Sequence, residues 1–263
     1  MTRTVFLGVP SPILTSDLLR TAYIGNLASK YKVIVLTPFI DSALAKAQAY
    51  FGAENVIYEK WEVENPKMWA RFKFLRICLV NEFDHLASIR HFYKRPSYRL
   101  NLRRRFLRTM GLPFSRILTA RFFSQLEYGL ISDSDAFTEL VRKHRPELVI
   151  TATPGLSAFE AELILRGKKC GLPSVAVDST WDNLTMNAKH IRQTDYLIVW
   201  NSLMKKEAVQ IHLYPPEKVF VSGVIRFDPY FAFESGEPGR EKFLLSKGLN
   251  PKYKTILHTT VTK

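Results

Sequence analysis

Short apolar runs that favour β-structure alternate with helical segments at both ends of this 263-residue chain. Residues 4–9, 32–37 and 55–61 are strand-like, and residues 17–30 and 42–51 between them carry apolar side chains at helical spacing. Strands separated by helices pair in parallel through right-handed crossovers. The order therefore predicts an α/β fold, a Rossmann-like parallel sheet with helices on both faces.

The same alternation returns in the second half of the chain. Four more runs are strand-like, at 147–152, 174–178, 195–200 and 218–222. Helical segments lie between them. Ser132 or Asp133 is expected to cap the helix that ends at His144, and Asn201 the helix that begins near Ser202. Residues 1–230 are thus predicted to form one Rossmann-like domain.

A long, basic and helical stretch, at about 66–125, interrupts this alternation and is predicted to be an insertion between sheet elements. From Arg71 to Arg121, thirteen lysines and arginines oppose two acids, so this stretch carries +11 of the chain's net charge of +14. Such a local basic field predicts an anionic partner. The predicted membrane or anion surface is Arg99, Arg103, Arg104, Arg105 and Arg108.

Leucine and phenylalanine are interleaved with these arginines, as in basic amphipathic helices that lie on anionic membranes. Nucleic acid is a competing partner for a basic surface. A solvated helix face without any partner is the third interpretation that the charge pattern leaves open.

The sequence argues against several classes of site. The two cysteines form no redox or metal pattern, and the six histidines lack paired ligand spacing, so no metal site is expected. There is no glycine-rich nucleotide-binding motif. The N-terminal apolar run is too short for a signal peptide, and no run of 18 apolar residues occurs. A cytoplasmic location is expected, either free or at the inner face of the membrane.

The most informative stretch runs from Asp178 to Asp228. It reads WDN-L-T after the strand at 174–178, then DYLIVWN, an H-x-Y-P-P-E-K-V turn, and VSG-x-x-RFD. This pattern resembles nucleotide-sugar-using proteins of the GT-B superfamily. Within it, the pattern is most similar to the CDP-glycerol glycerophosphotransferase-like and UDP-N-acetylglucosamine 2-epimerase-like proteins. The resemblance implies two Rossmann-like domains facing a cleft, the first for the acceptor and the second for the donor nucleotide.

Ligands of open α/β sheets bind beyond the carboxyl ends of the strands, where the candidate site residues lie. Asp182 is predicted to be the general base or to orient the acceptor, because an attacking hydroxyl group needs a carboxylate or imidazole beside it. The predicted substrate-binding residues are Thr153, Gly155, Asp178, Trp181, Asn183, Thr185, Arg226 and Asp228. The alternative is that Asp182 and Asn183 only turn the chain, Trp181 packs, and Arg226 marks a hinge.

The resemblance implies a transferase of polysaccharide biosynthesis. It would move a glycosyl or glycerophosphoryl group from a nucleotide-activated donor to a sugar or polyol acceptor, free or lipid-linked. A lipid-linked acceptor favours a membrane over nucleic acid as the partner of the basic insertion. No cofactor is expected, because the activated donor is a substrate.

The C-terminal stretch is predicted to lead into a second domain. Residues 231–252 have the composition of a connector, and 253–263 are expected to be the first strand of a second Rossmann-like domain that binds the donor. This chain would then be the acceptor half and inactive alone. A non-catalytic Rossmann-like module that binds an anionic membrane surface or nucleic acid is the alternative.

Overall fold

The computed structural model describes residues 3–11, 18–19, 21–39, 55–99, 101–231, 239–256 and 258. The chain divides into two compact units, Met1–Arg226 and Phe227–Lys263. The helix predicted at 42–51 lies outside the described residues, as does part of the helix predicted at 17–30.

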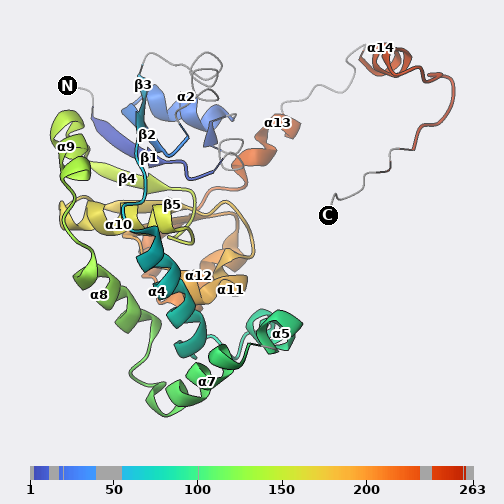
Figure 1. Cartoon of the computed structure of the whole chain (residues 1–263). Helices are drawn as coiled ribbons and strands as arrows, with labels where there is room; N and C mark the ends of the chain where they lie inside the picture. Colours follow the sequence, from blue (N-terminus) through green and yellow to red (C-terminus); the bar gives the residue numbers. More distant parts are fainter. Residues whose placement is uncertain are drawn as a thin grey trace. The chain divides into compact units, whose positions relative to one another are not determined.

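Seven parallel strands form one sheet in the first unit, in the order β3-β2-β1-β4-β5-β6-β7 (Figure 1). They are β1 (Thr4–Gly8), β2 (Lys32–Thr37), β3 (Val56–Lys60), β4 (Leu148–Thr151), β5 (Ser174–Val177), β6 (Tyr196–Val199) and β7 (Val219–Val221). The strand order reverses between β1 and β4, as in doubly wound sheets. This sheet confirms the predicted Rossmann-like α/β fold.

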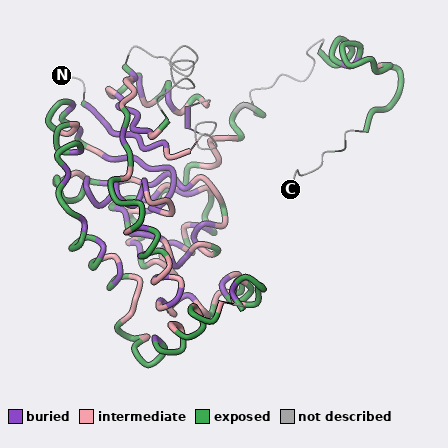
Figure 2. Tube along the Cα trace, viewed as in Figure 1, coloured by how far each residue is buried: buried purple, intermediate pink, exposed green. Residues whose placement is uncertain are grey.

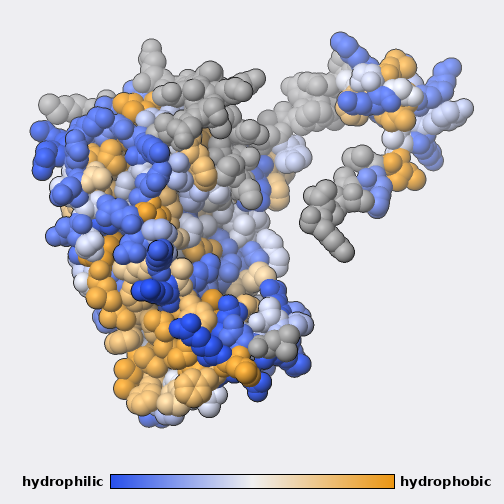
Figure 3. Space-filling view, in the orientation of Figure 1, coloured by the Kyte–Doolittle hydropathy of each residue, from blue (hydrophilic) through white to orange (hydrophobic). Residues whose placement is uncertain are grey.

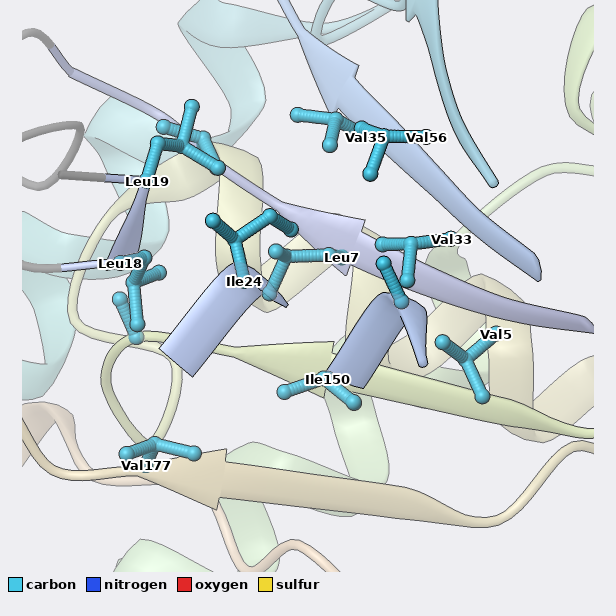
Figure 4. Close-up of a cluster of buried hydrophobic side chains, with 13 residues drawn as sticks. Val5, Leu7, Leu18, Leu19, Ile24, Val33, Val35, Val56, Ile150 and Val177 are labelled. Atoms are coloured by element: carbon cyan, nitrogen blue, oxygen red, sulfur yellow. The ribbon is translucent and has the colours of Figure 1, made fainter. Parts of the chain in front are cut away.

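Alternate residues of each strand pack on opposite faces of the sheet. Val5 and Leu7 of β1 join a cluster with α2 (Ala22–Ala28) on one face (Figure 4). Phe6, between them, packs on the other face with residues of α9 (Asp135–His144) and α10 (Ala158–Lys169). Because both faces are covered, the central strands β1, β2 and β4 consist almost entirely of buried residues, as Figure 2 shows.

Two glycines, one in the sheet and one in the helix, allow α10 to pack closely against the sheet. A Cβ atom at Gly8 of β1 would lie 2.5 Å from Cδ2 of Leu163, and one at Gly167 of α10 would lie 2.8 Å from Cγ2 of Val149. Larger residues at either glycine would push the helix away from the strands. The close contact holds the N-terminus of α10 at the carboxyl edge of the sheet.

The basic stretch between β3 and β4 is helical, as predicted. It consists of α4 (Pro66–Leu79), α5 (Ala87–Lys94), α6 (Pro96–Arg99), α7 (Leu102–Gly111), the 3-10 turn η1 (Leu112–Phe114) and α8 (Ala120–Leu130). Arg76 of α4 is fully buried and donates to Glu127 of α8 at 3.2 Å and to the Ala120 carbonyl oxygen at 2.9 Å. This network joins the first and last helices of the insertion.

A buried lysine ties the insertion to the segment before β6. Lys189, in the 3-10 turn η2 (Ala188–His190), donates to the carbonyl oxygen of Val80 and to the hydroxyl of Tyr93. Its ammonium group also lies 3.0 Å from Asp84. Burial lowers the pKa of Lys189 to about 8, against the opposing effect of Asp84.

The helix caps follow the sequence closely, with one correction. Asn201 caps α12 (Ser202–His212), accepting from the Met204 N–H at 2.9 Å, as predicted. The prediction of Ser132 or Asp133 as the cap of α9 is wrong, because Ser134 accepts from the Phe137 N–H at 3.0 Å. A capping side chain bonds the N–H groups at the start of its own helix, and α9 begins at Asp135.

The second unit contains α13 (Asp228–Phe231) and α14 (Gly239–Ser246). Within the stretch 253–263, residues 253–256 and 258 are described and belong to no helix or strand. The rest lies outside the described residues, so the strand expected there stays a prediction. Across the described ranges, no helix is both long and apolar enough to cross a bilayer.

Candidate functional site

A pocket opens at the carboxyl ends of β5, β6 and β7, the edge at which α/β sheets bind ligands. Apolar side chains from the core on the α2 side form part of its wall. The polar groups come from the segments that follow the three strands, and they belong to Asp178, Ser179, Trp200, Ser222 and Arg226.

Asp178 is the buried acid of this pocket, with 1% of its surface exposed. Its Oδ1 accepts from Nδ2 of Asn183 at 2.5 Å, whereas Oδ2 is buried without a hydrogen-bond partner in the described part of the chain. Burial raises the pKa of Asp178 to about 7 against the opposing effect of the hydrogen bond from Asn183, and the nearby negative charge of Glu160 adds to the rise. A carboxyl group that titrates near neutral pH is suited to accept a proton.

Glu160, in the first turn of α10, is a second buried acid near Asp178. Its Oε2 accepts from the hydroxyl of Thr153 at 2.6 Å and from that of Ser157 at 2.9 Å, while Oε1 has no partner among the described residues. Burial raises the pKa of Glu160 as well. Sequence reasoning missed this residue, although the Ser157-x-x-Glu160 spacing of a capping box signals it.

The turn that follows β7 places Arg226 in the lining of the same pocket as Asp178. Gly223 in this turn has a φ of +86°, a conformation that favours glycine. The Arg226 guanidinium donates to the Ser179 carbonyl oxygen at 2.7 Å and lies 5.8 Å from the ring centroid of Trp200. The Trp200 indole N–H donates to the Asp178 carbonyl oxygen at 2.8 Å. The pocket thus combines one acid, one guanidinium and one aromatic ring.

The predicted site residues of the loop after β5 differ in their burial and in their hydrogen-bond partners. Asn183 is buried and holds the Asp178 carboxyl group, whereas Trp181 is 66% exposed. Asp182 is half-buried, and its carbonyl oxygen accepts from the Met186 N–H at 2.7 Å at the start of α11 (Asn183–Met186). The Thr185 carbonyl oxygen accepts from Ser88 of α5 at 2.8 Å. The catalytic role of Asp182 therefore stays a prediction.

The predicted residues after β4 shape the turn into α10. Thr153 holds Glu160, and Gly155 has a φ of +74°. The Gly155 carbonyl oxygen accepts from Arg192, a residue that sequence reasoning did not single out. Asp228, the last predicted site residue, begins α13 in the second unit.

The predicted arginine surface is partly engaged within the insertion. Arg99, Arg103 and Arg105 are exposed, and Arg104 is half-buried. Arg108 is also half-buried, donates to Asp84 at 2.6 Å and lies 3.9 Å from the ring centroid of Tyr93. Of the five predicted arginines, Arg99, Arg103 and Arg105 are therefore the ones that remain open to solvent.

Beside these arginines the insertion presents a large apolar surface, which Figure 3 shows over the lower part of the first unit. Leu102, Phe106 and Met110 are spaced four residues apart on α7 and are 75%, 64% and 55% exposed. The surface continues over η1 and α8. We call it the α7–α8 apolar face, made of Leu102, Phe106, Met110, Leu112, Phe114, Ile117, Phe122, Leu126 and Leu130.

No protein-family model matches the chain, and no curated protein matches its sequence. Among solved structures, the chain is similar to the UDP-N-acetylglucosamine 2-epimerase from Rickettsia bellii, with 14% sequence identity and a TM-score of 0.47. The match covers 95% of this chain and 52% of that one, so the chain spans about half the length of that structure.

Proposed function

We propose that the pocket beside Asp178 binds a hydroxyl group of a sugar or polyol acceptor. We further propose that the chain is the acceptor side of an enzyme that transfers a glycosyl or glycerophosphoryl group from a nucleotide-activated donor. The observation that carries the proposal is the buried Asp178 carboxyl group with one oxygen left without a partner among the described residues. A buried polar atom without a hydrogen bond costs free energy, which a ligand hydroxyl would recover.

The chemistry needs a single proton acceptor. The acceptor hydroxyl gives its proton to Asp178 as its oxygen bonds to the anomeric carbon or phosphorus of the donor. The nucleotide leaves with the electron pair of the broken bond. A pKa of about 7 leaves part of Asp178 ionised, and therefore able to take the proton, at neutral pH.

The neighbouring side chains have distinct tasks in this proposal. Asn183 fixes the orientation of the carboxyl group through its 2.5 Å hydrogen bond. Arg226 stabilises the negative charge that develops during transfer, and Trp200 fixes the Asp178 backbone through its 2.8 Å hydrogen bond. The donor nucleotide is assigned to a second domain, in line with the resemblance to GT-B proteins.

The experiment compares Asp178→Asn with Asp182→Asn in the complete enzyme, assayed with CDP-glycerol and with nucleotide sugars on sugar and polyol acceptors. We expect Asp178→Asn to reduce turnover by about 10²-fold, as loss of a general base does, while Asp182→Asn retains activity. The opposite ranking would return the role of base to Asp182. Equal wild-type rates in both variants would remove both carboxylates from the mechanism.

A second function, attachment to an anionic membrane, is supported by the α7–α8 apolar face. Isolated apolar side chains are common on protein surfaces, but large contiguous apolar patches mark interaction sites. The exposed Arg103 and Arg105 lie on α7, and the exposed Arg99 ends α6 just before it. Arginines beside an apolar surface suit a bilayer with anionic headgroups. A second copy of this chain is a poorer occupant, because it would bring two strongly positive surfaces together.

A further inference from the structure

A second pocket lies between α4, the N-terminus of α10 and η2, and shares no lining residue with the pocket at Asp178. Its volume is about 190 Å³, room for several water molecules and therefore for a phosphate-sized group. Trp69 and Leu156 form apolar walls, and the polar lining comes from Lys73, Ser157, His190 and Arg192.

The charged groups around this pocket are predominantly positive. Arg76 and Arg192 are both buried, and both donate to the single carboxylate of Glu127. The other acid that acts on Arg76, Glu82, is exposed. Two buried guanidinium groups that share one buried carboxylate leave positive charge to be balanced, which is costly inside a protein.

Two polar side chains of the lining are available to a ligand. Lys73 is exposed, and neither its ammonium group nor the His190 ring has a hydrogen bond or ion pair within the described ranges. The charged groups that act most strongly on His190 are all cations: Lys73, Arg192, Arg76 and Lys189. Burial, with a further contribution from these cations, lowers the pKa of His190 to about 3, so the ring is neutral at pH 7 and can donate one N–H.

The N-terminus of α10 adds to this positive field. Ser157 caps the helix, and both Ser157 and Ala158 line the pocket. The positive end of the helix dipole therefore lies at the pocket wall. The carboxylate of Glu162 is already engaged, since it accepts from the Trp69 indole at 2.7 Å and from Arg166 at 2.8 Å.

We infer that this pocket is a binding site for a small oxyanion, such as a free phosphate ion or the phosphoryl group of a phosphorylated ligand. Lys73 pairs with the anion, the His190 ring donates to it, and Arg192 contributes charge, because its own hydrogen bonds go to Glu127, Gly155 and the His190 carbonyl oxygen. The bound anion balances the positive charge of Arg76 and Arg192 that the single carboxylate of Glu127 does not neutralise. This site is independent of the transfer reaction proposed above.

The test titrates the chain at pH 7, in low-chloride buffer, with inorganic phosphate, glycerol phosphate and neutral glycerol. Binding is followed by calorimetry and by the NMR signal of the Trp69 indole N–H. Lys73→Gln removes the exposed charge at the pocket, and Arg71→Gln is the matched control, since Arg71 is an exposed cation of the same helix outside the lining.

We expect saturable binding of phosphate or glycerol phosphate and no binding of glycerol. Lys73→Gln should weaken the binding at least about tenfold, and Arg71→Gln should leave it within about twofold of the wild type. Tighter binding of the ester would assign the site to a phosphorylated ligand, and tighter binding of free phosphate to the ion itself. Absence of binding up to about 20 mM would overturn the inference. Equal weakening by both variants would also overturn it, because it would indicate a diffuse positive surface.

Discussion

The Glu127 carboxylate and the Arg192 guanidinium form a two-point ion pair, with N···O distances of 2.9 and 3.0 Å. Glu127 lies on α8 of the insertion, and Arg192 lies between η2 and β6. The same carboxylate accepts from Arg76 of α4. The insertion is therefore bonded into the sheet domain by buried charge, and its removal would leave Arg192 without its counterion.

Glu127→Gln should destabilise the first unit strongly. The variant keeps the size of the side chain but leaves two buried guanidinium groups without an anion, a change that costs about 3–5 kcal/mol when one partner of a buried pair is lost. Denaturant unfolding followed by circular dichroism measures this loss. Glu139→Gln, at an exposed position of α9, is the control and should change stability little. Similar stabilities for the two variants would show that the Glu127 network carries little of the folding free energy.

The contribution of Asp178 to the stability of the wild type should fall as the pH rises from about 4 to about 7. Asp178 has an ordinary pKa of 3.8, which burial raises to about 7, so the folded chain keeps a proton that the unfolded chain has already lost. Asp178→Asn cannot lose this proton and retains an oxygen to accept from Asn183. The stability of the variant relative to the wild type should therefore increase over this pH range. Denaturant unfolding at pH 5 and pH 7.5 tests this prediction, and a constant difference would contradict the raised pKa.

Gly155→Ala should cost more stability than Gly171→Ala. Both glycines have a φ of +74°, so both substitutions carry the same strain of about 1–2 kcal/mol for a left-handed backbone. A Cβ at Gly155 would lie 3.0 Å from Cδ of Arg192, whereas a Cβ at Gly171 would meet nothing within 4 Å. Thermal unfolding of the pair measures the difference. Equal losses of stability would mean that the Arg192 side chain can move away from the added Cβ atom without a cost in free energy.

The α7–α8 apolar face should bind anionic vesicles through two separable contributions. Phe106→Ser should weaken binding at every salt concentration, because it removes apolar area. Charge reversal of Arg99, Arg103 and Arg105 should weaken binding mainly at low salt, since charges are screened over about 10 Å at 0.1 M. Vesicle sedimentation measures both effects, with Lys206→Glu, at an exposed position of α12, as the control. Equal binding to neutral and anionic vesicles would contradict the electrostatic part, and tighter binding to DNA would favour nucleic acid.

The sheet could be predicted from sequence because its central strands are buried on both faces and are therefore mainly apolar, as in 32–37. The presence of a polar loop after β5 could also be predicted, since such loops follow strand ends. Which of its two acids is buried could not be predicted. Asp178 and Asp182 are four residues apart, and burial distinguishes them only once Asn183 and Trp200 fold around the first.

The second pocket could not be predicted from sequence, because its residues come from three distant segments. Lys73 and His190 are more than a hundred positions apart, and the charge of Arg192 matters only beside Arg76 and Glu127. The basic stretch at about 66–125 was evident from the composition of the sequence. Composition alone does not show that Arg76 and Arg108 are used inside the insertion while Phe106 faces solvent.

The most direct test of the proposed acceptor site is the NMR signal of the Trp200 indole N–H, which is hydrogen-bonded to the Asp178 carbonyl oxygen in the pocket. The labelled chain is titrated with sugars, polyols and their phosphates. We predict a saturable shift of the Trp200 signal with at least one of these ligands, weakened about tenfold or more in Asp178→Asn and unchanged in Lys73→Gln. If no ligand of these classes shifts the signal, or if Asp178→Asn binds as tightly as the wild type, the assignment of this pocket to the acceptor is wrong.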